Sequence, residues 1–191
     1  DLITREIGAG IQLDGLLTGN DRLQLKGGYF GTDARNYIAT RVDMKRMRSY
    51  SYNVSRARIW GWDMQGNYQS DYFDWMLSYN RTESMDASSR EWLGSGNPDT
   101  LISDISIPVG HGGVSAGWRA ELSAAATHVK KGDPHQAGYA VHSFSLSYKP
   151  VSVKGFEASV TLDNAFNKLA MNGKGVPLSG RTVSLYTRYQ W

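Results

Sequence analysis

The sequence RTVSLYTRYQW (Arg181–Trp191) alternates apolar and polar side chains without a break. Successive side chains of a β-strand point to opposite faces, so every second residue shares a face. One face would carry Val183, Leu185, Thr187, Tyr189 and Trp191. The other face would carry Thr182, Ser184, Tyr186, Arg188 and Gln190. The stretch therefore predicts a β-strand with an apolar face that ends in aromatic residues and a hydrated opposite face.

The composition of the 191-residue chain fits many such strands. It contains no run of about 18 apolar residues, the length that a transmembrane helix needs, so we expect no helical membrane span. A membrane β-barrel places its apolar residues at alternate positions and needs no such run. The 21 Gly, 11 Tyr and 6 Trp, against 5 Pro, are typical of strands joined by tight turns and flanked by aromatic girdles.

Several classes of function are disfavoured by the sequence. The formal charge is +3, but the basic residues are scattered, so we expect no nucleic-acid binding. Cysteine is absent, which excludes disulfides, thiolate metal sites and a cysteine nucleophile. We find no nucleophile elbow, phosphate loop or metalloprotease helix, and we predict that the chain is not an enzyme. No signal peptide precedes Asp1, so either one was removed or the chain begins within a longer protein.

Period-two alternation recurs in nine segments bounded by turn residues. These predicted strands are Glu6–Leu13, Leu23–Tyr29, Ile59–Tyr68, Phe73–Asn80, Val114–Glu121, Leu122–Lys130, Ala140–Lys149, Phe156–Asp163 and Arg181–Trp191. Short turns are predicted near Asn20, Ser70, Ala120 and Ser152, and long connections at 31–53, 83–110, 131–138 and 167–180. Alternating short and long connections are typical of outer-membrane barrels, whose short turns are periplasmic.

A strand count of nine does not suit a complete bacterial barrel. Such barrels have an even number of strands. An open edge in lipid would leave backbone groups unpaired, at a cost of several kcal/mol for each group. We therefore expect residues 1–191 to be the C-terminal portion of a larger barrel; the alternative is a small barrel whose first strand is miscounted.

Three segments near the end resemble the last strands of TonB-dependent outer-membrane receptors. They are GYAVHSFSLSYKP (Gly138–Pro150), GFEASVTLDNAFNK (Gly155–Lys168) and GRTVSLYTRYQW (Gly180–Trp191). The segment Glu6–Ile38 is similar to the haem and haemophore receptors of this family. Ala165 stands where the family often has Leu, which is a mild departure.

The resemblance implies an all-β fold: an antiparallel transmembrane β-barrel of which this chain supplies about nine C-terminal strands out of 22. It implies a place in the bacterial outer membrane, with the plug domain and earlier strands outside residues 1–191. Trp191 would belong to the signal for barrel insertion.

The function implied is import of an iron-bearing ligand, energised through the TonB complex. Haem or a haem-carrier protein is favoured over a ferric siderophore as the transported ligand, and no covalently bound cofactor or resident metal is expected. TonB and the plug would be contacted through regions outside this chain. The alternatives are a siderophore receptor of the same family, a passive or adhesive outer-membrane barrel, and a soluble sugar-binding β-sandwich.

Candidate functional residues fall into four groups. A lipid-facing aromatic belt is predicted from Trp60, Trp62, Trp75, Tyr79, Trp118, Tyr148 and Tyr189. A basic loop that could contact an anionic ligand, a protein partner or lipopolysaccharide contains Arg41, Lys45, Arg46 and Arg48. His111 and His135, both placed in long connections, are the candidates for contact with haem, whereas His128 is placed in a strand and His142 at the membrane interface. Charges expected on the inner wall are Glu6, Asp63, Asp74, Glu157, Asp163, Arg119, Arg188 and Lys149.

Overall fold

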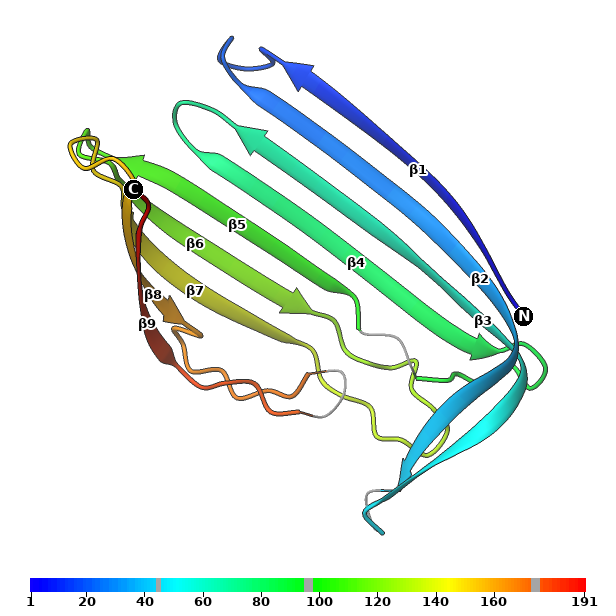
Figure 1. The fold of residues 1–191 in the computed structure, drawn as a ribbon. Helices are drawn as coiled ribbons and strands as arrows, with labels where there is room; N and C mark the ends of the chain where they lie inside the picture. Colours follow the sequence, from blue (N-terminus) through cyan, green and yellow to red (C-terminus); the bar gives the residue numbers. More distant parts are fainter. Residues whose placement is uncertain (44–45, 95–97, 173–175) are drawn as a thin grey trace.

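The computed structural model describes residues 1–43, 46–94, 98–172 and 176–191. These residues form a single curved antiparallel sheet of nine strands, whose order in the sheet follows their order in the chain (Figure 1). The strands are β1 (Leu2–Asp14), β2 (Arg22–Asp43), β3 (Arg48–Gln69), β4 (Asp74–Asp86), β5 (Thr100–Val109), β6 (Val114–Ser123), β7 (Tyr139–Tyr148), β8 (Phe156–Asp163) and β9 (Thr182–Tyr189). The described part of the chain contains no helix long and apolar enough to cross a membrane.

The register keeps the two faces of the sheet chemically distinct across every strand. Residues directly opposite each other in an antiparallel pair lie on the same face. One row of such partners is entirely apolar and runs through Leu13, Leu23, Tyr68, Trp75, Ile105, Trp118, Phe144, Leu162 and Val183. The next row, on the opposite face, runs through Asp14, Arg22, Gln69, Asp74, Ser106, Gly117, Ser145, Thr161 and Ser184. We call these two surfaces the apolar face and the polar face.

The apolar face is open to the surroundings. Leu146 and Leu185 are 54% and 73% exposed, and Trp75 is 40% exposed. A β-sandwich would bury these side chains against a second sheet, but the described residues form one sheet only. The soluble sandwich is therefore the wrong alternative.

The strands β2 and β3 extend far beyond the rest of the sheet. Each has 22 residues, about twice the 9–11 that a strand needs to cross a bilayer. Their pairing continues to Asp43 opposite Arg48, so the predicted loop at 31–53 is wrong. The far half is a hairpin that projects beyond the other strands (Figure 1). Aromatic and β-branched residues within the polar stretch, such as Tyr37, Ile38 and Tyr52, suit a strand and account for the extension.

The middle of the sheet also differs from the prediction. Strand β5 (Thr100–Val109) lies inside the segment predicted as a loop, and the predicted strand Leu122–Lys130 is wrong beyond Ser123. The turn expected near Ala120 lies instead at 110–113, where Gly110 and Gly113 have positive φ. Pro108 obscured the alternation of the preceding residues, yet it sits beside the strand end, where a proline is tolerated. The predicted number of strands was correct because one missed strand offset one false strand.

The turn between β1 and β2 is organised by a buried carboxylate. Asp21 is 2% exposed, and its Oδ2 accepts hydrogen bonds from the backbone N of Leu17 at 2.8 Å and the hydroxyl of Tyr68 at 2.9 Å. Burial alone would raise the pKa of Asp21, but these hydrogen bonds outweigh it and hold the pKa below its usual value. The carboxylate is therefore ionised at neutral pH and fixes the turn against the end of β3.

The turn between β7 and β8 holds the end of the chain. Gly155 has φ +80, and its carbonyl accepts a hydrogen bond of 2.9 Å from the backbone N of Gln190. A Cβ atom at Gly155 would lie 1.9 Å from the carbonyl oxygen of Gln190. Only glycine fits both the backbone conformation and this close approach.

We expect Gly155→Ala to destabilise the protein more than Gly110→Ala. Both positions have positive φ, which costs a non-glycine residue about 1–2 kcal/mol. A Cβ at Gly110 meets nothing within 4 Å, whereas the clash at Gly155 should add about 1–3 kcal/mol. Urea unfolding in detergent micelles, followed by tryptophan fluorescence, measures both losses. Equal losses would contradict the role assigned to the close approach.

Candidate functional site

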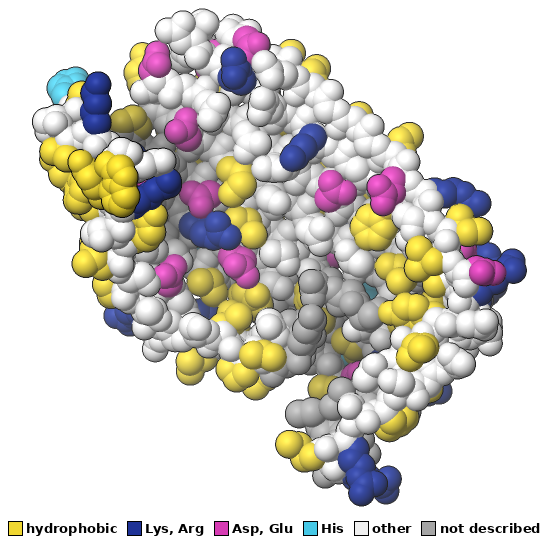
Figure 2. Space-filling view, in the orientation of Figure 1, with side chains coloured by type: hydrophobic (Ala, Val, Ile, Leu, Met, Phe, Trp, Pro, Cys, Tyr) yellow, Lys and Arg dark blue, Asp and Glu magenta, His cyan; other side chains and the backbone are white. Residues whose placement is uncertain are grey.

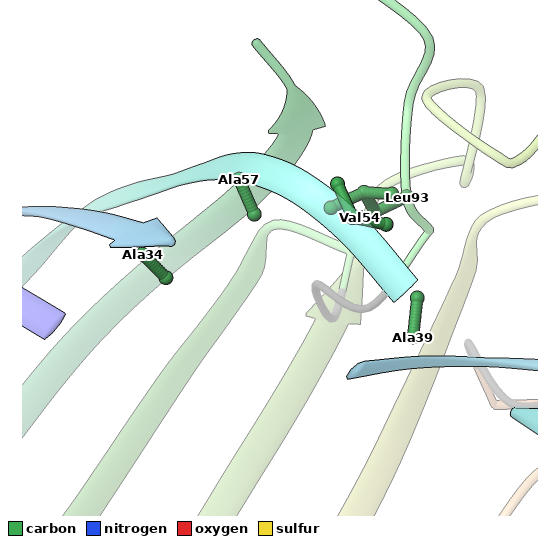
Figure 3. Close-up of a cluster of buried hydrophobic side chains, with 5 residues drawn as sticks. All are labelled: Ala34, Ala39, Val54, Ala57 and Leu93. Carbon is green, nitrogen blue, oxygen red and sulfur yellow. The ribbon is translucent and has the colours of Figure 1, made fainter. Parts of the chain in front are cut away.

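Three segments meet at one end of the sheet and form what we call the rim: the projecting hairpin (34–43 and 46–57), the connection after β4 (87–94 and 98–99) and the connection after β6 (124–138). Leu93 of the connection after β4 packs against Ala34, Val54 and Ala57 of the projecting hairpin (Figure 3). Lys130, in the connection 124–138, contacts the same hairpin: its Nζ atom lies 4.0 Å from the centroid of the Tyr52 ring. Both connections therefore pack against the hairpin. The rim is therefore a packed assembly and not a set of independent loops.

An aromatic and ionic cluster links two of these connections. The rings of Trp92 and His128 stack with centroids 4.1 Å apart and planes at 6°. The Nδ1 atom of His128 lies 2.9 Å from Oε1 of Glu83, whose other partner is Arg81. The Nη1 atom of Arg81 lies 3.6 Å from Oδ2 of Asp99, which places charges of both signs around a cavity of about 280 Å³. The prediction that His128 lies in a strand is wrong, since it lies in the connection after β6.

The two histidines proposed for haem contact lie at opposite ends of the sheet. His111 is in the short turn at 110–113, so its predicted place in a long connection is wrong. His135 lies in the rim connection 124–138. One ligand cannot bridge the two, and among the described residues no group of three His, Asp or Glu side chains is arranged to hold a metal ion.

The predicted aromatic belt lies on the apolar face. The register places all seven predicted members there: Trp60, Trp62, Trp75, Tyr79, Trp118, Tyr148 and Tyr189. Trp60 and Trp62 approach the rim, whereas Trp75, Tyr148 and Tyr189 lie near the short turns. This division into two bands is the pattern of the aromatic girdles of transmembrane barrels.

Two aromatic residues in the connections at this end of the sheet were not predicted. Trp92 lies 6.0 Å from Trp60 between ring centroids, and Phe166 lies 5.6 Å from His142. His142 also stacks on Trp118, with centroids 5.9 Å apart, and its register opposite Ala120 places it on the apolar face. Trp92 and Phe166 follow the ends of strands, where no periodicity could have indicated them.

The polar face carries ion pairs between neighbouring strands. The Nζ atom of Lys149 lies 3.0 Å from Oε1 of Glu157, and Nη1 of Arg119 lies 3.3 Å from Oδ2 of Asp104. Asp104 was missed because β5 was taken for a loop. Charges of both signs are scattered over the hollowed face in Figure 2. A wall of this kind suits contact with water and polar solutes.

The predicted basic loop is the tip of the projecting hairpin. Arg41 lies at the end of β2, Arg46 in the turn and Arg48 at the start of β3, while Lys45 lies outside the described residues. The tip stands apart from the rest of the sheet (Figure 1). It therefore presents positive charge away from the wall.

The DNAFN motif has a structural role. Asn164 has positive φ, and its side chain donates hydrogen bonds to the carbonyls of Lys168 and Ser179, at 3.0 and 2.9 Å. The Oδ1 atom of Asn167 accepts a hydrogen bond from the backbone N of Arg181 at 3.0 Å. The two asparagines thus fix the connection that leads into β9.

Comparison with known proteins finds the model of the "TonB dependent receptor-like, beta-barrel" family matching residues 4–167. The chain is 41% identical to a hemin receptor of Yersinia pestis over 98% of its own length and 28% of the receptor's. It is 38% identical to a hemin receptor of Yersinia enterocolitica, of which it covers 29%. A TonB-dependent heme receptor A of Haemophilus influenzae is 25% identical over 85% of the chain. The chain thus spans less than a third of the length of these relatives.

Solved structures share the fold at low sequence identity. The copper transporter OprC superposes with a TM-score of 0.79 at 19% identity, covering 98% of this chain and 32% of its own. The FrpB iron transporter of Neisseria meningitidis gives a TM-score of 0.70 at 13% identity, covering 97% of this chain and 31% of its own. Both are matched along nearly the whole curved sheet.

We expect His128→Ala to loosen the connection 124–138. The substitution removes the stacked ring and the contact with Glu83, a loss of about 1 kcal/mol or more, so local opening should increase about fivefold. The rate of trypsin cleavage after Lys130 and Lys131 measures this opening. His135→Ala, in the same connection, is the matched control. Equal cleavage rates in the two variants would show that the cluster does not hold the connection.

Proposed function

Because the chain belongs to the TonB-dependent receptor-like β-barrel family of the bacterial outer membrane, we propose that it forms part of the wall of a haem importer. The observation that carries this proposal is the pair of unbroken rows, one apolar and one polar, across all nine described strands. Such rows suit a wall between lipid and a hydrated interior. Haem is favoured because the relatives at 41% and 38% identity are both hemin receptors.

We propose that residues 1–191 are the C-terminal portion of a 22-strand barrel. Strands β1 and β9 each pair with one neighbour and leave the other edge open. An open edge in hydrocarbon is costly, so further strands of the same protein should pair with both. The plug and the segment that engages TonB would likewise come from polypeptide outside these residues.

In the proposed mechanism the rim captures the ligand and the polar face lines its route. The basic hairpin tip, with Arg46 and Arg48, suits the carboxylates of haem or an acidic surface of a carrier protein. Movement of the plug on TonB engagement would open the passage. The wall binds and guides the ligand, and the mechanism requires no covalent step.

A ferric siderophore is the second candidate ligand. Structures matched over almost the whole chain include the ferric enterobactin receptor PfeA of Pseudomonas aeruginosa, at 16% identity. Identity at this level supports the fold alone. The relatives with the higher identity therefore favour haem.

Transport by the full-length receptor tests the proposal. We expect a strain that depends on this receptor to grow with hemin as sole iron source, and to lose that growth when TonB is deleted. Replacing Arg46 and Arg48 with Ser should raise the hemin concentration required by about tenfold or more, since the loss of a single charged hydrogen bond, about 1.5–3 kcal/mol, already corresponds to at least that factor. Growth on ferric siderophores but not on hemin would contradict the choice of ligand.

We expect Leu146→Arg to impair membrane insertion and Ser147→Arg to be tolerated. Leu146 lies on the apolar face, two residues inside the girdle residue Tyr148. An arginine on the lipid face costs about 0–1 kcal/mol near the interface and about 2–4 kcal/mol at the midplane, so a cost between these values is expected here. Ser147, its neighbour on the polar face, pairs with Ser115 and Ser159, which leave room for a long side chain. The folded fraction in outer membranes, measured by heat-modifiable electrophoretic mobility, reports both effects. Equal impairment of the two variants would contradict the assignment of the faces.

A further inference from the structure

A groove of about 670 Å³ lies at the rim end of the apolar face, across β1 to β4. Its floor contains Gly31, which pairs with Arg5 on one side and Trp60 on the other. Because Gly31 has no side chain, the ring of Tyr29 reaches over its backbone: a Cβ at Gly31 would lie 3.7 Å from the Tyr29 hydroxyl oxygen. The groove has a charged end at Arg5 and Arg58 and an apolar end at Ile7, Tyr29 and Trp60.

The charged end has more positive than negative groups. Asp33 is shared between Arg56, at 3.1 Å, and Arg58, at 3.4 Å, through the same carboxylate oxygen. The side chains of Arg56 and Arg58 are 49% and 59% exposed, and Arg5 is also exposed. Three guanidinium groups thus face one carboxylate. Two further acids lie near the groove. Glu83 is already paired with Arg81 and His128. Glu6 lines the groove, but its register opposite Phe30 places it on the polar face.

The apolar end continues into the surface proposed to contact lipid. Tyr29 and Trp62 pack with ring centroids 4.6 Å apart, and they form the next pair on the same face, two residues from Gly31 and Trp60 towards the short turns. Two residues further towards the rim from Trp60 is Arg58, so the guanidinium groups stand just beyond the aromatic girdle. This is the depth at which lipid head groups meet water.

We propose that this groove binds the phosphorylated glucosamine head group of lipid A, the lipid anchor of lipopolysaccharide. Exposed guanidinium groups form bidentate hydrogen bonds with phosphate. Acyl chains attached to the same molecule would lie along Ile7, Tyr29 and Trp62. The charged end of the groove lies towards the rim and the apolar end lies deeper in the membrane-facing surface. This is the order of head group and acyl chains in an anionic lipid of the outer leaflet. The proposal rests on the membrane placement proposed above and is independent of the transported ligand.

The test compares two double variants of the full-length receptor. Arg5→Gln with Arg58→Gln removes two groove charges and leaves Asp33 paired with Arg56. Arg22→Gln with Arg119→Gln is the matched control, since both arginines lie on the polar face and each pairs with one aspartate. Native mass spectrometry of receptor purified from outer membranes measures the lipid A retained. We expect the groove variant to retain about tenfold less and the control to match the wild type.

Growth on hemin distinguishes this proposal from the function proposed above, since the groove variant should grow as the wild type does. Equal retention of lipid A in both variants would overturn the groove assignment, whatever the transported ligand. Binding to nanodiscs gives a second measurement on the unaltered receptor. Lipid A with both phosphates should bind about tenfold more tightly than dephosphorylated lipid A or phosphatidylglycerol. Equal binding of all three would show that the groove does not recognise phosphate and would also overturn the proposal.

Discussion

Cross-strand register is the constraint on which the rest of the structure depends. A slip of one residue in any hairpin would move its apolar side chains to the polar face. The described strands contain no such slip, and the row from Leu13 to Val183 stays apolar from one edge of the sheet to the other. The short turns help to fix this register. Asp21 fixes the first turn through Tyr68, and Gly155 holds the strand that ends the sheet.

The sequence carried enough information to predict the fold class, the two faces and the family. Seven belt residues and the inward-facing charges follow from a period of two, which depends only on local backbone geometry. The same reasoning failed where turn residues and strand residues mix. Pro108 hid β5, and the polar composition of residues 31–53 hid the extension of β2 and β3.

The rim could not be predicted because its contacts join segments far apart in the sequence. His128 meets Trp92 and Glu83 through packing of two irregular connections, and no spacing in the sequence encodes that meeting. His111 was assigned to a long connection for a related reason: the turn at 110–113 can be recognised only when the preceding residues are recognised as strand β5. The groove around Gly31 depends on the register of three strands, and periodicity shows only one strand at a time.

Every described strand pairs only with its neighbours in the chain, so no crossover connects distant parts of the sheet. The entropy lost on closing each hairpin is therefore that of one connection between consecutive strands, and it is lost in successive steps. A sheet of this kind can grow like a zipper, each new strand docking on the edge left by the last. The hydrogen-bonding edge that is most exposed at any stage is then also the template for the next addition, and only the final closure must bring distant segments together.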